Sequence, residues 1–370
     1  MKASGAIVLV DANLVRYLPM RMLLVTNDFP PKAGGIQQYL GKFVGHLDAT
    51  VRVLAPREPG AVAEPDVFRN EKAFMWPTRS VRDWIEEHIA SFVPDLVLYG
   101  APYPLAQLGP RLRASSGVPF AVMTYGAEAI IPMVIPIARQ LVVRSIRRAD
   151  HVFSLSCYTG AKVERVTGVS PVVLGAGIDT SIFAPAERPG DDLVVGCVSR
   201  FIPRKGHARV LRSVAELRQR GHDVSALMVG TGRLEARLRR LSSTLEVPVT
   251  FATEVASDEL PELYRRMSVF VMPSVSRWWG LEAEGLGLVY LEASASGLPV
   301  VAGSSGGAPE TITPETGFVA GSVQEIVACV EPLLADAARR REMGSNGRAF
   351  VASTYSWNEV VRRFLERIDI

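Results

Sequence analysis

The chain has 370 residues, of which 48% are hydrophobic and 21% are charged, and its formal net charge is +3. This composition excludes a disordered chain, and the length favours two domains over one. The excess of positive charge lies in the first half of the sequence. It is too small for a nucleic-acid-binding protein, so we expect no nucleic-acid partner, but it suits a phosphate-bearing ligand or an anionic membrane surface.

The cysteines and the N-terminus indicate a cytoplasmic setting. Cys157, Cys197 and Cys329 lie far apart and form no CxxC pair, which argues against a disulfide framework or a zinc site and favours a reducing compartment. The apolar run Ala6–Val10 is too short for a signal peptide or a membrane span. Since Met20 precedes the first strong strand, the first twenty or so residues can be an extension.

The first half of the chain alternates short apolar runs with amphipathic helical patterns. Strands are predicted at Met22–Thr26, Val51–Ala55, Leu96–Tyr99, Phe120–Thr124, His151–Ser154 and Val172–Leu174. Helices are predicted at Ile36–Leu47, Ser80–Phe92, Ile137–Arg148 and Thr159–Val166. The alternation predicts a parallel sheet with helices on both faces.

The polar, proline-containing segment Phe183–Asp192 predicts a linker, after which the alternation restarts. Strands are predicted at Leu193–Ser199, Ser225–Val229, Val249–Phe251, Val269–Met272 and Val300–Ala302. Helices are predicted at His207–Arg220, Leu234–Leu245, Ser257–Met267, Leu288–Ser296, Val323–Leu334 and Ala337–Thr354. Two successive doubly wound halves predict a ligand cleft between them, at the carboxyl ends of the strands.

Two segments in the second half combine charge with glycine. Arg200, Lys205 and Gly206 lie between a strand and a helix, where cations and free N–H groups together suit a diphosphate; a solvated basic loop is the alternative. Glu284 and Glu292 flank a glycine-rich helix start. A partly buried glutamate needs partners, which sugar and ribose hydroxyls would provide; a structural ion pair is the alternative.

Other motifs are weaker or absent. Gly34 and Gly35 before the first helix offer amides to a phosphate or a sugar, although a plain turn has the same pattern. Gly230 and Gly232 begin a dinucleotide fingerprint, but Glu235 replaces its third glycine, so we exclude a nicotinamide cofactor. The sequence has no Walker A, G-x-S-x-G, H-E-x-x-H or Asp-x-Asp motif, and we expect no metal and no cofactor.

The combined pattern resembles glycosyltransferase family 4 over nearly the whole chain from Arg21 onward. The residues that carry the resemblance are Gly34, Gly35, Arg200, Lys205, Glu284, Glu292 and the segment GGAPE at 306–310. The Glu-x7-Glu element within EGLGLVYLEASASGLPVVA is its most specific piece. VTNDFPPKAGGIQQYL and SSGGAPETI are similar, more narrowly, to the actinobacterial phosphatidylinositol-mannoside mannosyltransferases, which use GDP-mannose.

The resemblance implies an α/β fold of the GT-B type, with two doubly wound Rossmann-like domains and an interdomain cleft. Residues 1–186 would bind the acceptor, residues 187–354 would bind the nucleotide sugar, and residues 355–370 would form a helix that crosses back. The implied activity is a retaining, metal-independent hexosyl transfer. The sugar would be mannose from GDP-mannose, and the acceptor would be lipid-linked or a glycoside, such as a phosphatidylinositol mannoside.

The resemblance also implies site residues. Arg200 and Lys205 would hold the donor diphosphate and stabilise the leaving group, Glu284 would bind sugar hydroxyls, and Glu292 would bind the ribose. Further donor contacts would come from Gly34, Gly35, Val255, Gly285, Leu286, Gly287 and Leu288.

One position departs from the family pattern. Relatives usually carry histidine in a His-Gly-x-Glu segment, whereas this chain has Tyr125 followed by Gly126, Ala127 and Glu128. Tyrosine can donate a hydrogen bond to a sugar hydroxyl, but with an ordinary pKa of about 10 it is a poor base near neutral pH. We therefore take Tyr125 as a candidate catalytic residue and as a sign of a different acceptor or donor sugar.

Several alternatives remain open. The apolar run Ile130–Ile137 and the arginines of the helix after it predict peripheral binding at the inner face of the plasma membrane; an ordinary helix with a solvated basic face is equally compatible. The rival functions are a family 4 transferase with a UDP-sugar and another acceptor, a sugar-nucleotide epimerase of the same architecture, and a non-catalytic binding protein, suggested only by Tyr125.

Overall fold

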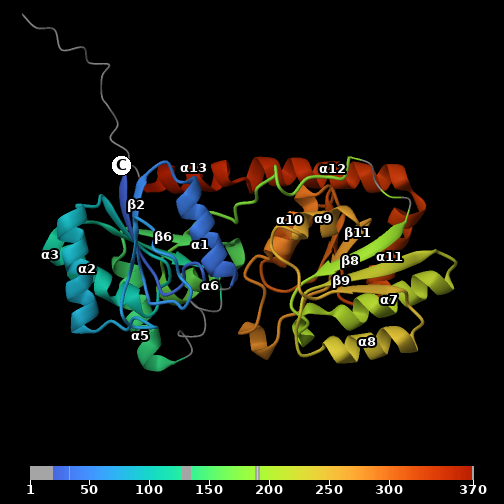
Figure 1. Ribbon diagram of the computed structural model, residues 1–370, viewed down its shortest axis with the longest axis horizontal. Coiled ribbons are helices and arrows are strands. Elements are labelled where there is room, and N and C mark those ends of the chain that lie inside the picture. Colours follow the sequence, from blue (N-terminus) through green and yellow to red (C-terminus); the bar gives the residue numbers. More distant parts are fainter. Residues whose placement is uncertain (1–19, 33, 127–134, 188–189, 191, 369–370) are drawn as a thin grey trace, which may run out of the picture.

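The computed structural model describes residues 20–32, 34–126, 135–187, 190 and 192–368. Most of the proposed N-terminal extension lies outside these residues, as do Ala127 and Glu128. The described chain forms two lobes, each built on a parallel sheet (Figure 1). The prediction of two successive doubly wound α/β halves is therefore confirmed.

The first lobe contains, in the described part of the chain, a seven-stranded sheet in the order β3-β2-β1-β4-β5-β6-β7. Its strands are β1 Arg21–Val25, β2 Thr50–Ala55, β3 Val67–Arg69, β4 Leu96–Tyr99, β5 Phe120–Thr124, β6 His151–Ser154 and β7 Val172–Val173. Its helices are α1 Gly35–His46, α2 Arg79–Phe92, the short 3-10 helix η1 Leu105–Leu108, α3 Gly109–Ser116, α5 Pro136–Arg148 and α6 Cys157–Thr167. The central strands are buried because helices cover both faces.

The second lobe contains, among the described residues, a six-stranded sheet in the order β10-β9-β8-β11-β12-β13. Its strands are β8 Leu193–Val198, β9 Val224–Val229, β10 Val249–Ala252, β11 Val269–Met272, β12 Val300–Ala302 and β13 Gly317–Val319. Its helices are η3 Pro203–Lys205, α7 His207–Gln219, α8 Glu235–Thr244, α9 Leu260–Arg265, η4 Trp278–Gly280, α10 Leu288–Ala295, η5 Ala308–Thr311, α11 Val323–Ala335 and α12 Ala337–Thr354.

The last helix, α13 (Trp357–Ile368), belongs to the first lobe by its contacts. Figure 1 shows α12 and α13 following one another along one edge of both lobes. The Phe364 ring lies 5.1 Å from that of Phe43 and 4.9 Å from that of Phe153. The chain crosses between the lobes twice, and the two crossings run side by side, since the Ile178 N–H donates to the Tyr355 carbonyl at 2.7 Å.

Candidate active site

The basic loop after β8 brings two buried cations together. A 3-10 turn, η3, places Arg204 and Lys205 inward, with 9% and 6% of their surfaces exposed. Gly206 then takes a left-handed conformation (φ 81°), and a side chain there would collide with the Pro273 carbonyl. Arg200, earlier in the loop, is exposed, and its guanidinium contacts no acidic group of the described chain. The sequence prediction placed Arg200 and Lys205 together but did not single out Arg204.

Glu284 is the partner of both buried cations. Its Oε2 atom lies 2.6 Å from Lys205 Nζ and 2.7 Å from Arg204 Nη1. Burial by itself raises the pKa of Glu284, but the two cations outweigh burial and hold that pKa below its ordinary value. Burial lowers the pKa of Lys205, and Glu284 opposes this shift. Glu282 also pairs with Arg204 at 3.6 Å and with Arg277 at 3.7 Å. The five groups together carry one net positive charge, which suits an anionic ligand.

The backbone after Glu284 offers hydrogen-bond donors. Within the described chain, the N–H groups of Gly285, Leu286, Gly287 and Leu288 donate to no acceptor. Gly287 (φ 96°) starts the eight-residue helix α10, so these amides stand at the positive end of a helix. The Leu286 side chain is buried and anchors this loop in the core. This geometry can bind a phosphate oxygen.

Glu292, one turn inside α10, has a neutral partner. The Tyr264 hydroxyl donates to Glu292 Oε2 at 2.8 Å. Burial outweighs this hydrogen bond and the ammonium of Lys42 on α1, so the pKa of Glu292 lies above its ordinary value. A half-buried carboxylate without an ion pair retains acceptor capacity for ligand hydroxyls.

Three other predicted positions lie at the start of α1 and in the loop after β10. Gly34 and Gly35 start α1, which Figure 1 shows on the side of the first lobe that faces the second. Both glycines are exposed, and Gly34 has a φ of 152°. Val255 is half-buried in the loop after β10. No hydrogen bond among the described residues joins these three positions to Glu284.

Tyr125 follows β5 and is buried, with 4% of its surface exposed. Its ring meets the Tyr39 ring edge-on at 5.5 Å, and its hydroxyl donates to Met123 Sδ at 3.5 Å. Its carbonyl lies against Gly285 so closely that a side chain at Gly285 would approach it to 2.5 Å. Tyr125 therefore lies at the junction of the lobes, next to the loop of free amides.

Direct polar contacts join the lobes beside this point. The Ser156 hydroxyl donates to the Gly285 carbonyl at 2.6 Å. The Glu310 carboxylate, from the GGAPE segment, accepts from the N–H groups of Cys157 and Tyr158 at 2.7 Å each. A carboxylate of the second lobe thus caps helix α6 of the first. We call Ser156, Cys157, Tyr158, Gly285 and Glu310 the seam.

Arg204 and the seam residues, apart from the GGAPE motif and Gly285, do not stand out in the sequence. The adjacency of Arg204 to Lys205 was a local signal for the former. Among the residues that the structure describes, no group of three or more His, Cys, Asp or Glu side chains could hold a metal ion. The expectation of metal-independent chemistry remains a prediction.

Similar proteins match nearly the whole length of this chain. A family model described as Glycosyl transferases group 1 matches residues 179–350. A GDP-mannose-dependent alpha-(1-6)-phosphatidylinositol monomannoside mannosyltransferase of Mycolicibacterium smegmatis is 39% identical, over 94% of this chain and 98% of the relative. A GDP-mannose-dependent monoacylated alpha-(1-6)-phosphatidylinositol monomannoside mannosyltransferase of Corynebacterium glutamicum is 34% identical, over 91% of this chain and 94% of the relative.

Solved structures with low sequence identity share the fold. Sucrose-phosphate synthase from Thermosynechococcus elongatus superimposes with a TM-score of 0.74 and 20% identity, over 95% of this chain and 98% of that structure. Anabaena Alr3699/HepE in complex with UDP gives a TM-score of 0.79 and 18% identity, over 95% of this chain and 100% of that structure. At these identities the similarity concerns the arrangement of the two lobes.

Proposed function

Since this chain belongs to the group 1 glycosyl transferases, that is, to glycosyltransferase family 4 with the GT-B fold, we propose that it transfers mannose from GDP-mannose to a phosphatidylinositol mannoside. The observation that carries the proposal is the 39% identity, along nearly the entire chain, to an enzyme named for this reaction. The geometry of the cleft supports the same chemistry through its buried cations and free amides. The expected product retains the anomeric configuration of the donor.

The donor would lie along the second lobe. The amides of Gly285 to Leu288 would bind the distal phosphate, and Glu292 would accept hydrogen bonds from the ribose. Arg200, exposed and without an acidic partner in the described chain, is available for the diphosphate. Lys205 would contact the same group while Glu284, its present partner, turns part of its acceptor capacity to the sugar hydroxyls.

Cleavage of the sugar–phosphate bond places negative charge on the diphosphate and positive charge on the anomeric carbon. Cations and amides fixed before the reaction stabilise this developing charge, at about 3–4 kcal/mol per well-placed donor. Lys205 is already held by Glu284, so little reorganisation is needed. The seam would hold the lobes closed around the reacting groups and exclude water.

The acceptor would be lipid-linked, so the protein would work at a membrane surface from the cytoplasmic side. None of the described helices is both long and apolar enough to traverse a bilayer. Peripheral attachment is therefore the arrangement that we propose.

A second candidate is a family 4 transferase that uses a UDP-sugar and another acceptor. The observation that favours it is Tyr125, which stands where relatives usually have histidine. A thermal-shift comparison of GDP-, UDP- and ADP-sugars distinguishes the two, because a ligand that binds the folded state raises its melting temperature. Incubation with donor alone addresses the epimerase alternative, since an epimerase yields an isomer of the donor.

The direct test combines a transfer assay with a double variant. Arg200→Ala with Lys205→Ala should abolish mannose transfer from GDP-mannose to phosphatidylinositol monomannoside while the circular dichroism spectrum stays native. Arg237→Ala with Arg240→Ala, which removes two exposed arginines of α8, is the matched control and should retain activity. Retained transfer in the first variant would refute the assignment of these cations.

A further inference from the structure

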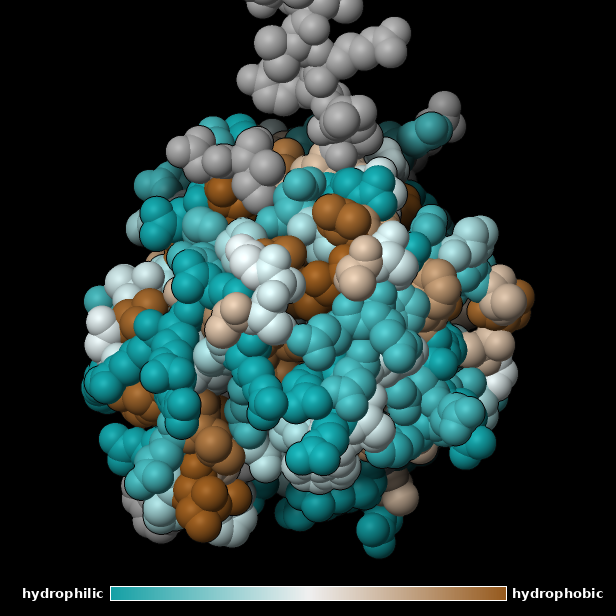
Figure 2. All heavy atoms as spheres, turned by 90° about the vertical axis from the view of Figure 1, so that its left-hand side faces the viewer, coloured by the Kyte–Doolittle hydropathy of each residue, from teal (hydrophilic) through white to brown (hydrophobic). Residues whose placement is uncertain are grey.

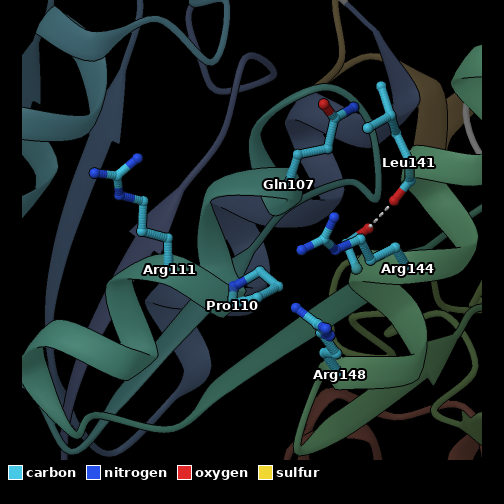
Figure 3. A pocket seen from close by; sticks show the side chains of 7 residues that line it. Gln107, Pro110, Arg111, Leu141, Arg144 and Arg148 are labelled. Atoms are coloured by element: carbon cyan, nitrogen blue, oxygen red, sulfur yellow. Dashed lines mark hydrogen bonds between the residues drawn. The ribbon is translucent and has the colours of Figure 1, made fainter.

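A cavity in the first lobe lies between α3 and α5. Its volume is about 420 Å³, and it shares no residue with the cleft. Its lining residues, which we call the basic pocket, are Gln107, Pro110, Arg111, Leu141, Arg144, Ser145 and Arg148. Figure 3 shows Arg144 and Arg148 reaching from α5 toward Pro110, with Arg111 on the opposite rim and directed away.

Arginines dominate the charge around this cavity. Between residues 96 and 149 the sequence has six arginines and a single acidic residue, Glu128. Arg113 pairs with Asp150, whereas Arg111, Arg144 and Arg148 form no ion pair within the described chain. Like charges at positions i and i+4 of a helix destabilise it. A phosphate between Arg144 and Arg148 would relieve this repulsion and accept forked hydrogen bonds.

The same face of α5 is apolar at its other end. Ile137, Leu141, Arg144 and Arg148 follow the spacing i, i+4, i+7, i+11 and therefore share one face. Ile137 is 74% exposed and Leu141 is 37% exposed, and Ile135, just before the helix, is 56% exposed. Figure 2 shows a hydrophobic cluster at the lower edge of this end of the molecule, the edge at which α5 lies in Figure 1.

This face of α5 is therefore apolar at its N-terminal end and basic at its C-terminal end. With a rise of about 1.5 Å per residue, the isoleucine at 137 stands roughly 10 Å from Arg144 along the axis. This separation is similar to the depth to which an interfacial helix buries its apolar side, about 5–10 Å into the boundary between headgroups and acyl chains. An acidic protein or a nucleic acid would neutralise the arginines but would leave the isoleucines in water.

We propose that the basic pocket binds the phosphate of an anionic phospholipid headgroup while Ile137 and Leu141 enter the acyl-chain region of the same leaflet. Helix α5 would then enter the bilayer surface with its N-terminal end first, and the pocket would be a lipid site separate from the acceptor site. This proposal rests on the proposed function, because a membrane-binding site would bring the enzyme to a lipid acceptor. Its test needs neither donor nor acceptor.

The test measures binding to vesicles of phosphatidylcholine with and without phosphatidylglycerol. The variant Arg144→Gln with Arg148→Gln keeps good helix formers and should bind the anionic vesicles roughly tenfold more weakly or worse, because each basic residue near an anionic surface adds to affinity. The matched control, Arg237→Gln with Arg240→Gln, removes the same charge from α8 and should bind within twofold of wild type. Transfer between water-soluble substrates should be equal in all three proteins.

Several results of these measurements would contradict the proposal. Unchanged vesicle binding in the pocket variant, or an equal loss in the α8 control, would overturn it. A melting temperature that rises with inorganic phosphate or glycerol phosphate and depends on Arg144 and Arg148, without vesicle binding, would assign the pocket to a free phosphate ester instead. Ile137→Ser with Leu141→Ser should also weaken vesicle binding, and no loss there would overturn the insertion of α5. Failure of mannose transfer would leave these results unaffected.

Discussion

The charges around Glu284 show how a residue-level prediction depends on backbone geometry. Burying Lys205 and Glu284 would be costly if either stood alone, since an unpaired buried charge destabilises a fold by several kcal/mol. Their contact at 2.6 Å removes that cost. Arg204 joins them because the η3 turn directs two consecutive side chains inward, a detail that strand and helix periodicity does not predict. Gly206 allows this turn through its left-handed conformation.

Glu292 gives the clearest prediction at the residue scale. Glu292→Gln keeps the shape of the side chain but removes the charge and half of the acceptor capacity toward a ribose, so the KM for GDP-mannose should rise roughly tenfold. The catalytic rate constant should change less, because the ribose is remote from the bond that breaks. Steady-state kinetics measures both.

Tyr264→Phe is the matched control, because it removes the present partner of Glu292 without altering the carboxylate. Its KM should change by less than that of Glu292→Gln. If Glu292→Gln lowers the catalytic rate constant and leaves KM as it was, the carboxylate belongs to the chemical step and not to the ribose.

At the scale of elements, the contact between the lobes at the seam involves the N-terminus of helix α6. The Glu310 carboxylate accepts from two N–H groups at the start of α6, which carries a partial positive charge. Glu310→Gln can satisfy only one of these donors with its carbonyl and has no charge. We expect a loss of about 1–3 kcal/mol from the contact, a shift toward open lobes, and a lower catalytic rate constant.

Small-angle scattering of the Glu310→Gln variant should show a larger radius of gyration than that of wild type. Glu315→Gln, which alters an exposed glutamate of the same lobe, should match wild type in both scattering and transfer. A Glu310→Gln protein with native dimensions and a native rate would mean that the seam does not control closure.

The sequence predicted the regular elements more fully than the contacts between them. β4, β5, β6 and α12 have the predicted bounds because their apolar runs are continuous or their caps are clear. β3, β13 and α3 were missed, since each is short and lacks a strong apolar period. The pairing of Glu310 with α6 joins residues far apart in the sequence, and nothing local in either segment specifies it.

For the molecule as a whole, the decisive arrangement is the return of the chain to the first lobe. The two crossings are hydrogen-bonded to each other at Ile178 and Tyr355. Two chain segments paired in this way can bend together, which lets the lobes approach while they remain attached. In the proposed function the nucleotide sugar lies between the lobes, so this motion would close the lobes around it.

Helix α13 makes the stability of the first lobe depend on the end of the chain. Phe364 is fully buried between Phe43 and Phe153, so Phe364→Ala should cost about 3–5 kcal/mol of unfolding free energy. Urea denaturation should show a lower midpoint, and because α13 follows α12 directly the two lobes should still unfold in one transition. Arg367→Ala, on the exposed face of the same helix, should leave the midpoint unchanged. A Phe364→Ala protein that loses less than about 1 kcal/mol would show that α13 only covers a lobe that is stable without it.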